Sequence, residues 1–154
     1  MSAIAIGANQ GMFARARVPK TGTLQDLCIA IVTPAGNISV AVYTIGATTW
    51  TRVYTTGIIV CPAASGWANV GNPAVAVTKG DEIMFGVSTD SASTGFGRAM
   101  PLSSGDFYTL PTGLLSNTPK MGGLDNSLHP MPATVTAAGP SALGSVPGVL
   151  ARVV

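Results

Sequence analysis

The chain has 154 residues, of which 47% are hydrophobic and only 9% are charged, and its formal net charge is +2. A typical soluble protein has about 25% charged residues, so this deficit is the most informative feature of the composition. Nucleic-acid binding is disfavoured because the sequence has no basic cluster. No apolar stretch approaches the ~20 residues of a membrane-spanning helix, so we expect no membrane insertion. We expect one domain with a neutral surface that partner subunits partly cover.

Two cysteines, Cys28 and Cys61, and a single histidine, His129, bear on redox state and metal binding. Residues 1–4 lack a basic segment followed by an apolar stretch, so we expect no secretion signal. Without a secretory context the two thiols are expected to be reduced and buried, and a disulfide is the alternative if their strands are adjacent. Two cysteines and one histidine cannot build a structural zinc site, and we expect no metal or other cofactor.

Strand patterns follow one another along the chain, whereas helix signals are nearly absent because Gly and Pro are scattered throughout. Gly57 predicts a bend or bulge within one long run, and Gly36 and Gly80 lie in short turns between neighbouring runs. Together these features predict an all-β fold, an antiparallel β-sandwich of jelly-roll type with about eight strands. Alternating or β-branched runs predict strands at 13–18, 24–32, 37–45, 51–61, 73–78, 82–88 and, with a weaker pattern, 106–110.

The last third of the sequence changes character. Residues 112–132 are rich in Gly, Pro, Asn and Ser, which predicts a loop-rich segment. Residues 146–154 are too apolar for a solvated tail, so we predict a strand that returns to the core. Residues 1–154 would then form a single β-sandwich domain. The side chains that carry the prediction for the last strand are Val146, Val149, Leu150 and Val153.

No arrangement of residues typical of catalysis is recognisable. The single histidine, His129, has a loop context and no Gly-x-Ser-x-Gly elbow accompanies it, so a surface loop histidine is the simpler interpretation. A glycosidase remains the rival enzymatic hypothesis, because its two carboxylates can be far apart in sequence. We expect that the protein is not an enzyme. The acids available for such a pair are Asp26, Asp81, Glu82, Asp90, Asp106 and Asp125.

Four side chains are candidates for contacts with other molecules. Trp50, near the tip of a predicted hairpin, and Trp67 could stack on a sugar if their rings are exposed, whereas packing in or beside the core is the simpler interpretation. Arg15 and Arg17 lie two residues apart on one predicted strand and therefore face the same side. They would lie on a solvated sheet face or contact another subunit.

Several short motifs occur in a fixed order over residues 11–154. They are Gly36-Asn37-Ile38-Ser39-Val40-Ala41-Val42-Tyr43, Arg52-Val53-Tyr54-Thr55-Thr56-Gly57, Pro62-Ala63-Ala64-Ser65-Gly66-Trp67, Val75-Ala76-Val77-Thr78-Lys79-Gly80, Pro130-Met131-Pro132-Ala133-Thr134 and Val146-Pro147-Gly148. In this order they resemble a β-sandwich module of the virion proteins of tailed bacteriophages.

The resemblance implies a non-enzymatic structural role in the virion. The expected protein is a capsid decoration or minor capsid protein that stabilises or coats the surface of the particle. It would assemble as a homo-oligomer, most simply a trimer because decoration proteins often occupy three-fold positions of capsids. Its other partner would be the major capsid or tail protein. The alternative is a carbohydrate- or receptor-binding module of a phage tail or head fibre, with a host surface glycan as ligand.

Overall fold

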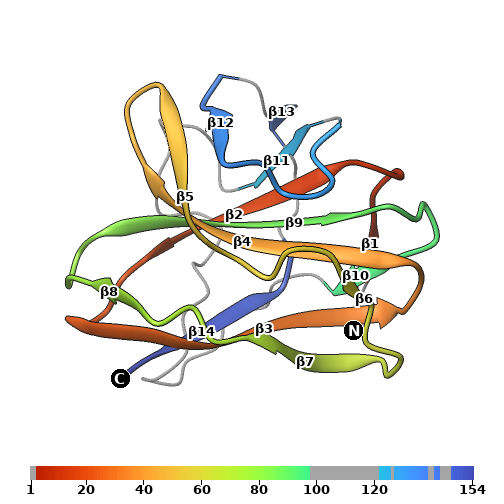
Figure 1. Ribbon diagram of the computed structural model, residues 1–154, viewed down its shortest axis with the longest axis horizontal. Helices are drawn as coiled ribbons and strands as arrows, with labels where there is room; N and C mark the ends of the chain where they lie inside the picture. The colour runs from red at the N-terminus through yellow and green to blue at the C-terminus, as the bar shows by residue number, and fades with distance from the viewer. Residues whose placement is uncertain (1–2, 98–121, 126, 139–140, 143–146) are drawn as a thin grey trace.

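The protein is described from a computed structural model that covers residues 3–97, 122–125, 127–138, 141–142 and 147–154. Over these residues the chain forms fourteen β-strands, arranged in two antiparallel sheets that pack face to face (Figure 1). One of the sheets is curled into a half-barrel. The all-β sandwich expected from the strand spacing is therefore confirmed. Within the same ranges no helix is long and apolar enough to cross a membrane.

Sheet A contains six strands and is organised around one long central strand, β3. Two strands pair with each side of β3, and β1 extends the sheet beyond β10. On one side of β3 (Gly22–Thr33) lie β10 (Gly95–Gly97) and β14 (Val149–Val153), and β1 (Ala3–Ala5) pairs with β10. On the other side of β3 lie β7 (Gly66–Gly71) and β8 (Val75–Val77).

Sheet B contains eight strands, with β2, β9 and β4 at its centre. In their register Phe13 lies opposite Gly86, and Gly86 lies opposite Ala41. The order along the sheet is β12 (Thr134–Thr136), β5 (Thr49–Thr55), β4 (Asn37–Ile45), β9 (Glu82–Thr89), β2 (Gly11–Arg17), β11 (Gly122–Asp125) and β13 (Ser141–Ala142), and β6 (Ile59–Val60) also pairs with β4.

Most of the expected strands are present with shifted ends. The run predicted at 51–61 is divided into β5 and β6, and Gly57 between them has φ +66°, which confirms the expected bend. Gly36 and Gly80 adopt φ +58° and +94° in the predicted turns. The strand expected at 106–110 lies outside the described residues. Sequence patterns missed the shorter strands β1, β7 and β10 to β13, which have two to six residues each.

The main core lies between the two sheets and takes one face of each central strand. Fully buried members include Leu27 and Ile31 of sheet A and Val40 and Val87 of sheet B. The C-terminal strand β14 pairs with β3 and supplies four buried side chains, so the described part of the predicted strand does return to the core. These are Val149, Leu150, Ala151 and Val153; Val146 lies outside the described residues.

A second, smaller core covers the outer face of sheet B. It includes Phe13, Tyr43 and Met84 from the sheet, and Met131 and Val135 from the C-terminal third of the chain. The segment from 127 to 137, including β12, lies across this face above β4 and β9 (Figure 1). Sheet B is thus covered on both faces, and the predicted loop-rich segment contributes to a core at its C-terminal end.

Candidate functional site

The two tryptophans have opposite environments. Trp50 is only 2% exposed and packs edge-to-face on Phe13, with 5.1 Å between ring centroids. The proposed role of Trp50 in sugar stacking is therefore wrong, because a ring in the second core offers no face to a ligand. Trp67 is 42% exposed on the outer side of β7, where it lies beside Ala30 and Gly148. Of the two rings, Trp67 alone can meet a ligand or a partner.

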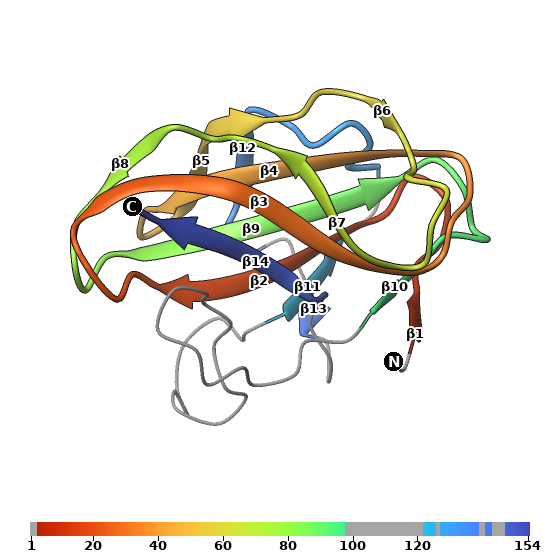
Figure 2. The same cartoon turned by 90° about the horizontal axis from the view of Figure 1, so that it is seen from below.

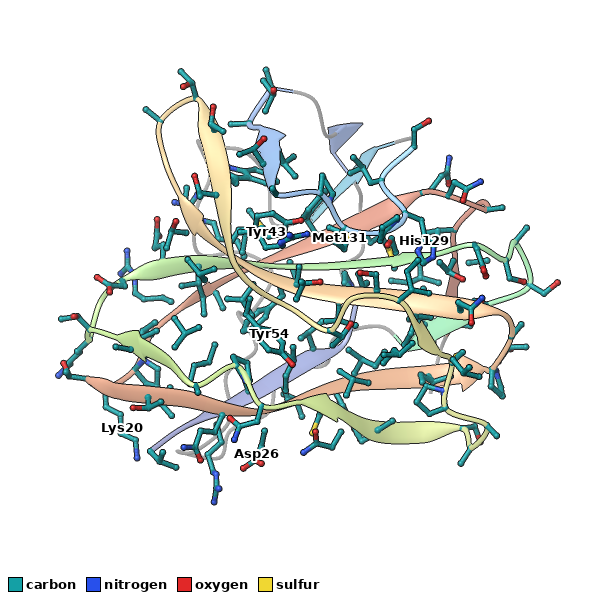
Figure 3. All side chains as sticks on the ribbon, viewed as in Figure 1. Lys20, Asp26, Tyr43, Tyr54, His129 and Met131 are labelled. Atoms are coloured by element: carbon teal, nitrogen blue, oxygen red, sulfur yellow. The ribbon has the colours of Figure 1, made fainter. Side chains whose placement is uncertain are left out.

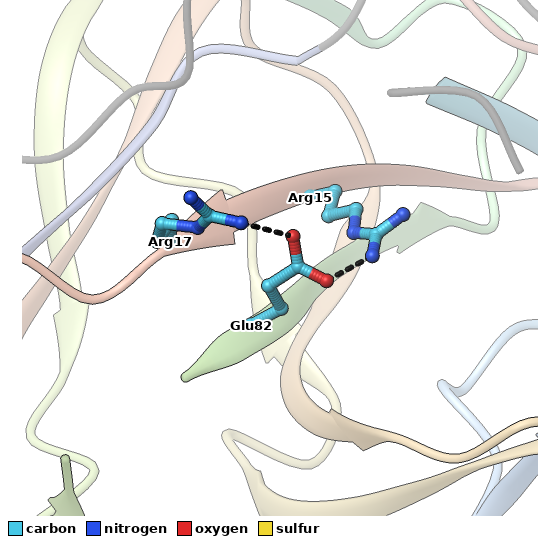
Figure 4. A network of polar contacts seen from close by, with 3 residues as sticks. All are labelled: Arg15, Arg17 and Glu82. Atoms are coloured by element: carbon cyan, nitrogen blue, oxygen red, sulfur yellow. Dashed lines mark hydrogen bonds and ion pairs between the residues drawn. The ribbon is translucent and has the colours of Figure 1, made fainter. Parts of the chain in front are cut away.

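Arg15 and Arg17 do face the same side of β2, as expected, and both reach the carboxylate of Glu82 at the start of β9 (Figure 4). The Arg15 side chain is largely buried and bonds one carboxylate oxygen. Arg17 is 56% exposed and lies 3.4 Å from the other oxygen. A solvated sheet face thus describes Arg17 but not Arg15. Two guanidinium groups share one carboxylate, which leaves a net positive charge at this end of sheet B.

Polar contacts fix residues 127–137, which we call the covering segment, to the outer face of sheet B. The Tyr43 hydroxyl donates to the carbonyl oxygen of Pro132 at 2.9 Å, and Arg52 Nη1 donates to that of Met131 at 2.6 Å. The Met131 N–H in turn donates to Ser39 Oγ at 3.2 Å. Figure 3 shows Tyr43, Met131 and His129 together above the sheet. Arg52 is therefore engaged inside the molecule, and burial raises the pKa of the Tyr43 hydroxyl well above its ordinary value.

A serine and the single histidine meet beneath this segment. Ser88 Oγ and His129 Nδ1 are 3.0 Å apart, a nucleophile–base distance that no sequence motif predicted. Ser88, however, is fully buried, so its hydroxyl is not accessible to a substrate. The Asp90 carboxylate accepts its hydrogen bonds from Asn37 rather than from the imidazole. The pair fastens the segment around His129 to β9, and the geometry gives it no catalytic role.

The Asp90 carboxylate closes one end of the sandwich. It accepts hydrogen bonds from the backbone N–H and the side-chain Nδ2 of Asn37, both at 2.7 Å. The backbone hydrogen bond and then the side-chain one hold the pKa of Asp90 below its ordinary value. The contact joins the start of β4 to the turn that follows β9, which is a structural role.

The other acids are also engaged separately. Asp26 pairs with Arg152 at 2.6 Å, and Asp81 accepts a hydrogen bond from the Thr78 N–H at 3.0 Å. Asp106 and the side chain of Asp125 lie outside what the structure describes. Among the residues it does describe, no three His, Cys, Asp or Glu side chains form a group that could hold a metal ion.

The two cysteines are free, as expected. Cys61 is buried at the edge of the main core, and Cys28 is partly buried on β3. Burial raises the pKa of both thiols, and the nearby Asp26 carboxylate raises that of Cys28 further. Both therefore remain protonated and unreactive at neutral pH.

One long side of the sandwich is bounded by β5 and β6 of sheet B and by β7 and β8 of sheet A (Figures 1 and 2). We call it the open side. Three large apolar side chains are exposed along it: Val53 at 41%, Ile58 at 58% and Val60 at 78%. From residue 38 to residue 78 the only charged residue is Arg52, which bonds Met131 on the outer face of sheet B. The four strands that bound the open side thus contain a single charged residue, Arg52, and expose large apolar side chains.

A groove indents the open side at the end away from β6. It has a volume of about 510 Å³ and lies between the edge of β8 and the turn of the β4–β5 hairpin. Its wall is part polar and part apolar, and the charged residues that line it are Arg17, Asp81 and Glu82. Its apolar lining residues are Ile45, Val53, Val75, Ala76, Val77 and Ile83. A smaller pocket has a volume of about 270 Å³ and is lined by Ile31, Val32, Ser65 and Gly66. Gly66 directly precedes Trp67 in the sequence.

Compared with models of known protein families and with curated proteins, the chain matches none. The functional conclusion therefore depends on the chemistry of the surfaces described above. Sequence reasoning singled out Trp67 and the arginine pair. It missed the open side, although the long interval with a single charged residue was a signal for it.

Proposed function

We propose that this chain is a non-enzymatic structural protein of a tailed-bacteriophage virion, most simply a capsid decoration or minor capsid protein. The observation that carries the proposal is the open side, where large apolar side chains are exposed along strands that contain a single charged residue. Exposed apolar patches of this kind mark protein interfaces. An all-β sandwich with a buried serine–histidine contact fits a building block better than a catalyst.

In this role the protein works by burying surface against its neighbours. Its partners are further copies of itself, with a trimer as the expected order, and the major capsid or tail protein. The low charge limits the cost of contact, because burying a neutral surface avoids the desolvation of unpaired ions. The site of action is the outer surface of the particle.

The test uses particles produced by the phage genome that encodes this chain, with and without its coding sequence. We expect particles that lack the protein to lose infectivity faster on heating. Purified protein added back should bind them and restore their resistance. Particles of unchanged resistance that do not bind the added protein would contradict the proposal.

A second candidate function is favoured by one observation, the exposure of Trp67. An indole on a strand surface can stack on a sugar ring, and Asn69 lies exposed two residues further along β7. In this alternative the protein is a glycan-binding module of a phage tail or head fibre. Titration with polysaccharide from the host surface should then change the fluorescence of Trp67, and a Trp67→Ala variant should not bind.

A further inference from the structure

The ring of Trp67 spans three neighbouring segments of sheet A. Its strand, β7, pairs with one side of β3, where Trp67 lies opposite Ala30. On the other side of β3, the Ala30 N–H donates to the carbonyl oxygen of Gly148 at 2.8 Å. A Cβ atom added to Gly148 would lie 3.0 Å from Ala30 Cβ and 3.2 Å from Trp67 Cη2, the far end of the indole. The ring therefore reaches from β7 across β3, over Ala30, to Gly148.

This arrangement presents one face of the indole to solvent. Ala30 is fully buried although it does not belong to the main core, which fits an indole lying over it. Trp67 itself is 42% exposed, so the face turned away from Ala30 is open. Gly148 has no side chain to lift the far end of the ring from the sheet. A flat aromatic face held in this way is a platform on which another ring can stack.

Neutral polar groups flank the platform. Asn69 is exposed two residues beyond Trp67 on β7, so both side chains lie on the same face of the sheet, about 7 Å apart along the strand. Asn69 Oδ1 accepts a hydrogen bond from the Gly71 N–H at 3.0 Å, which orients the amide, and Nδ2 is the donor that it offers to a ligand. Beyond Ala30 on β3, Val32 lines the smaller pocket together with Ser65.

We propose that Trp67 and Asn69 form a binding site for neutral glycans. This inference rests on the second candidate function and deepens it, because it names the residues of the site and the class of sugar. The C–H face of a pyranose ring stacks on the indole, and one of its hydroxyl oxygens accepts a hydrogen bond from Asn69 Nδ2. The smaller pocket gives room for the next sugar residue.

Charge selects a neutral sugar as the ligand. The described strands of sheet A contain only two charged residues, Asp26 and Arg152, and these pair with each other at 2.6 Å. An acidic sugar or a nucleic-acid phosphate would meet no uncommitted cation on these strands and would lose hydration without compensation. A purely apolar partner would strip water from Asn69 Nδ2 without replacing the hydrogen bond. Neutral hydroxyl groups avoid both costs.

The test is titration of the intact protein with glycans of defined chemistry. The neutral probes are cellohexaose, maltohexaose and mannohexaose, and the acidic comparison is hexagalacturonate. Trp50 is only 2% exposed, so a change in indole fluorescence on binding reports on Trp67. Calorimetry measures the affinities of the variants, because Trp67→Ala removes the reporting fluorophore. Far-UV circular dichroism verifies that each variant folds.

We expect at least one neutral hexasaccharide to bind and hexagalacturonate not to bind. Trp67→Ala should weaken binding by about tenfold or more, and Asn69→Ala by about twofold to tenfold through the loss of one hydrogen bond. Trp67→Phe should lose less affinity than Trp67→Ala, because it keeps a smaller aromatic face. Thr136→Ala is the matched control: it removes an exposed polar side chain from a strand of sheet B and should leave binding unchanged.

A protein that binds none of the three neutral hexasaccharides would overturn the inference. So would binding that survives both Trp67→Ala and Asn69→Ala, or hexagalacturonate that binds as tightly as the neutral probes. If Trp67→Ala does not fold, Trp67→Phe and Asn69→Ala decide the outcome. If no glycan binds and Trp67→Ala lowers the oligomer mass in sedimentation velocity, Trp67 belongs to a protein contact instead.

These outcomes are distinct from failure of the proposed functions. Host polysaccharide that binds equally well without the Trp67 indole would contradict the inferred site and leave glycan binding standing. Neutral glycans that bind through Trp67 but do not occur on the host surface would contradict only the role of the chain as a host-binding module. A chain that binds these glycans but is absent from phage particles would contradict only the virion role.

Discussion

Gly86 lies on the outer face of sheet B, against the side chain of Met131. A Cβ atom added there would collide with Met131 Cε and would lie 3.0 Å from Phe13 Cε1 and 3.1 Å from Tyr43 Cε2. Met131 Cε thus occupies the space that a side chain at residue 86 would need, and the Phe13 and Tyr43 rings also crowd that space. We therefore predict that Gly86→Ala destabilises the protein, although alanine is ordinarily better than glycine in a strand.

The magnitude follows from two opposing effects. Overpacking of a core by one methyl group costs about 1–3 kcal/mol. The reduced backbone entropy of alanine offsets about 0.5–1 kcal/mol of this cost. We expect a net loss of about 0.5–2 kcal/mol in the free energy of unfolding for Gly86→Ala, measured by urea denaturation and followed by the fluorescence of the buried Trp50.

A double-mutant cycle shows whether the collision with Met131 is the cause. Met131→Ala alone should cost about 2–5 kcal/mol because it empties the second core. In the double variant the Met131 Cε atom is absent, so alanine at residue 86 has nothing to collide with there. The double variant should therefore lose at least ~0.5 kcal/mol less stability than the sum of the losses of the two single variants. Gly57→Ala is the control: it has no neighbour within 4 Å but a φ of +66°, so it should cost stability without coupling to Met131. Additive losses at Gly86 and Met131 would refute the reasoning.

Three further predictions concern other parts of the fold. Deleting residues 149–154 removes the three large buried side chains Val149, Leu150 and Val153, which contribute about 5–9 kcal/mol together. The truncated chain should therefore be unfolded or insoluble in circular dichroism and solubility assays. A soluble protein with near-native melting would contradict this. Asn37 lowers the pKa of Asp90 in the folded protein, so the ionised carboxylate stabilises the fold at pH values above its unfolded pKa of about 3.9. This stability is lost as the pH falls through the lower pKa of the folded state. Melting temperatures measured between about pH 7 and pH 2 should show the loss in the wild type and not in Asp90→Asn. Arg15→Met should lower the free energy of unfolding by about 2 kcal/mol or more, and Arg17→Met by less than ~0.5 kcal/mol, because only the Arg15 side chain is largely buried. Chemical denaturation measures both changes. Equal effects would count against the burial argument.

Sequence patterns predicted those strands whose side chains alternate or are β-branched. β2, β3, β4 and β9 were found because their apolar periodicity is set by the main core. The bend at Gly57 was predictable for a local reason, since a glycine within a β-branched run seldom continues the strand. The short strands β1 and β10 were not predictable, because three residues carry too little pattern to distinguish a strand from a loop.

The second core shows a limit of a different kind. β4 carries apolar residues on both faces, but the sequence did not reveal the segment that covers the outer one. Residues 127–137 contain Pro130, Pro132 and few large side chains, so their composition is that of a loop. The contact of Met131 with Gly86 depends on residues 45 positions apart. For the same reason Trp50, on β5, became a core residue rather than an exposed hairpin residue.

The candidate surfaces divide in the same way. Trp67 and the arginine pair were recognisable from residue type and spacing, whereas the groove is formed by five strands that only the folded chain brings together. Exposure of Ile58 and Val60 could not be read from the sequence either. A run of apolar β-branched residues predicts burial, and here the bend at Gly57 turns Ile58 and Val60 toward solvent instead.

The proposal that the chain is a virion structural protein is tested by quantitative mass spectrometry of purified particles from the phage whose genome encodes it. The account predicts that the protein co-purifies with intact particles through a density gradient. It should be present in many copies per particle, in a fixed ratio to the major capsid or tail protein. A chain that is abundant in infected cells but absent from purified particles would contradict the account.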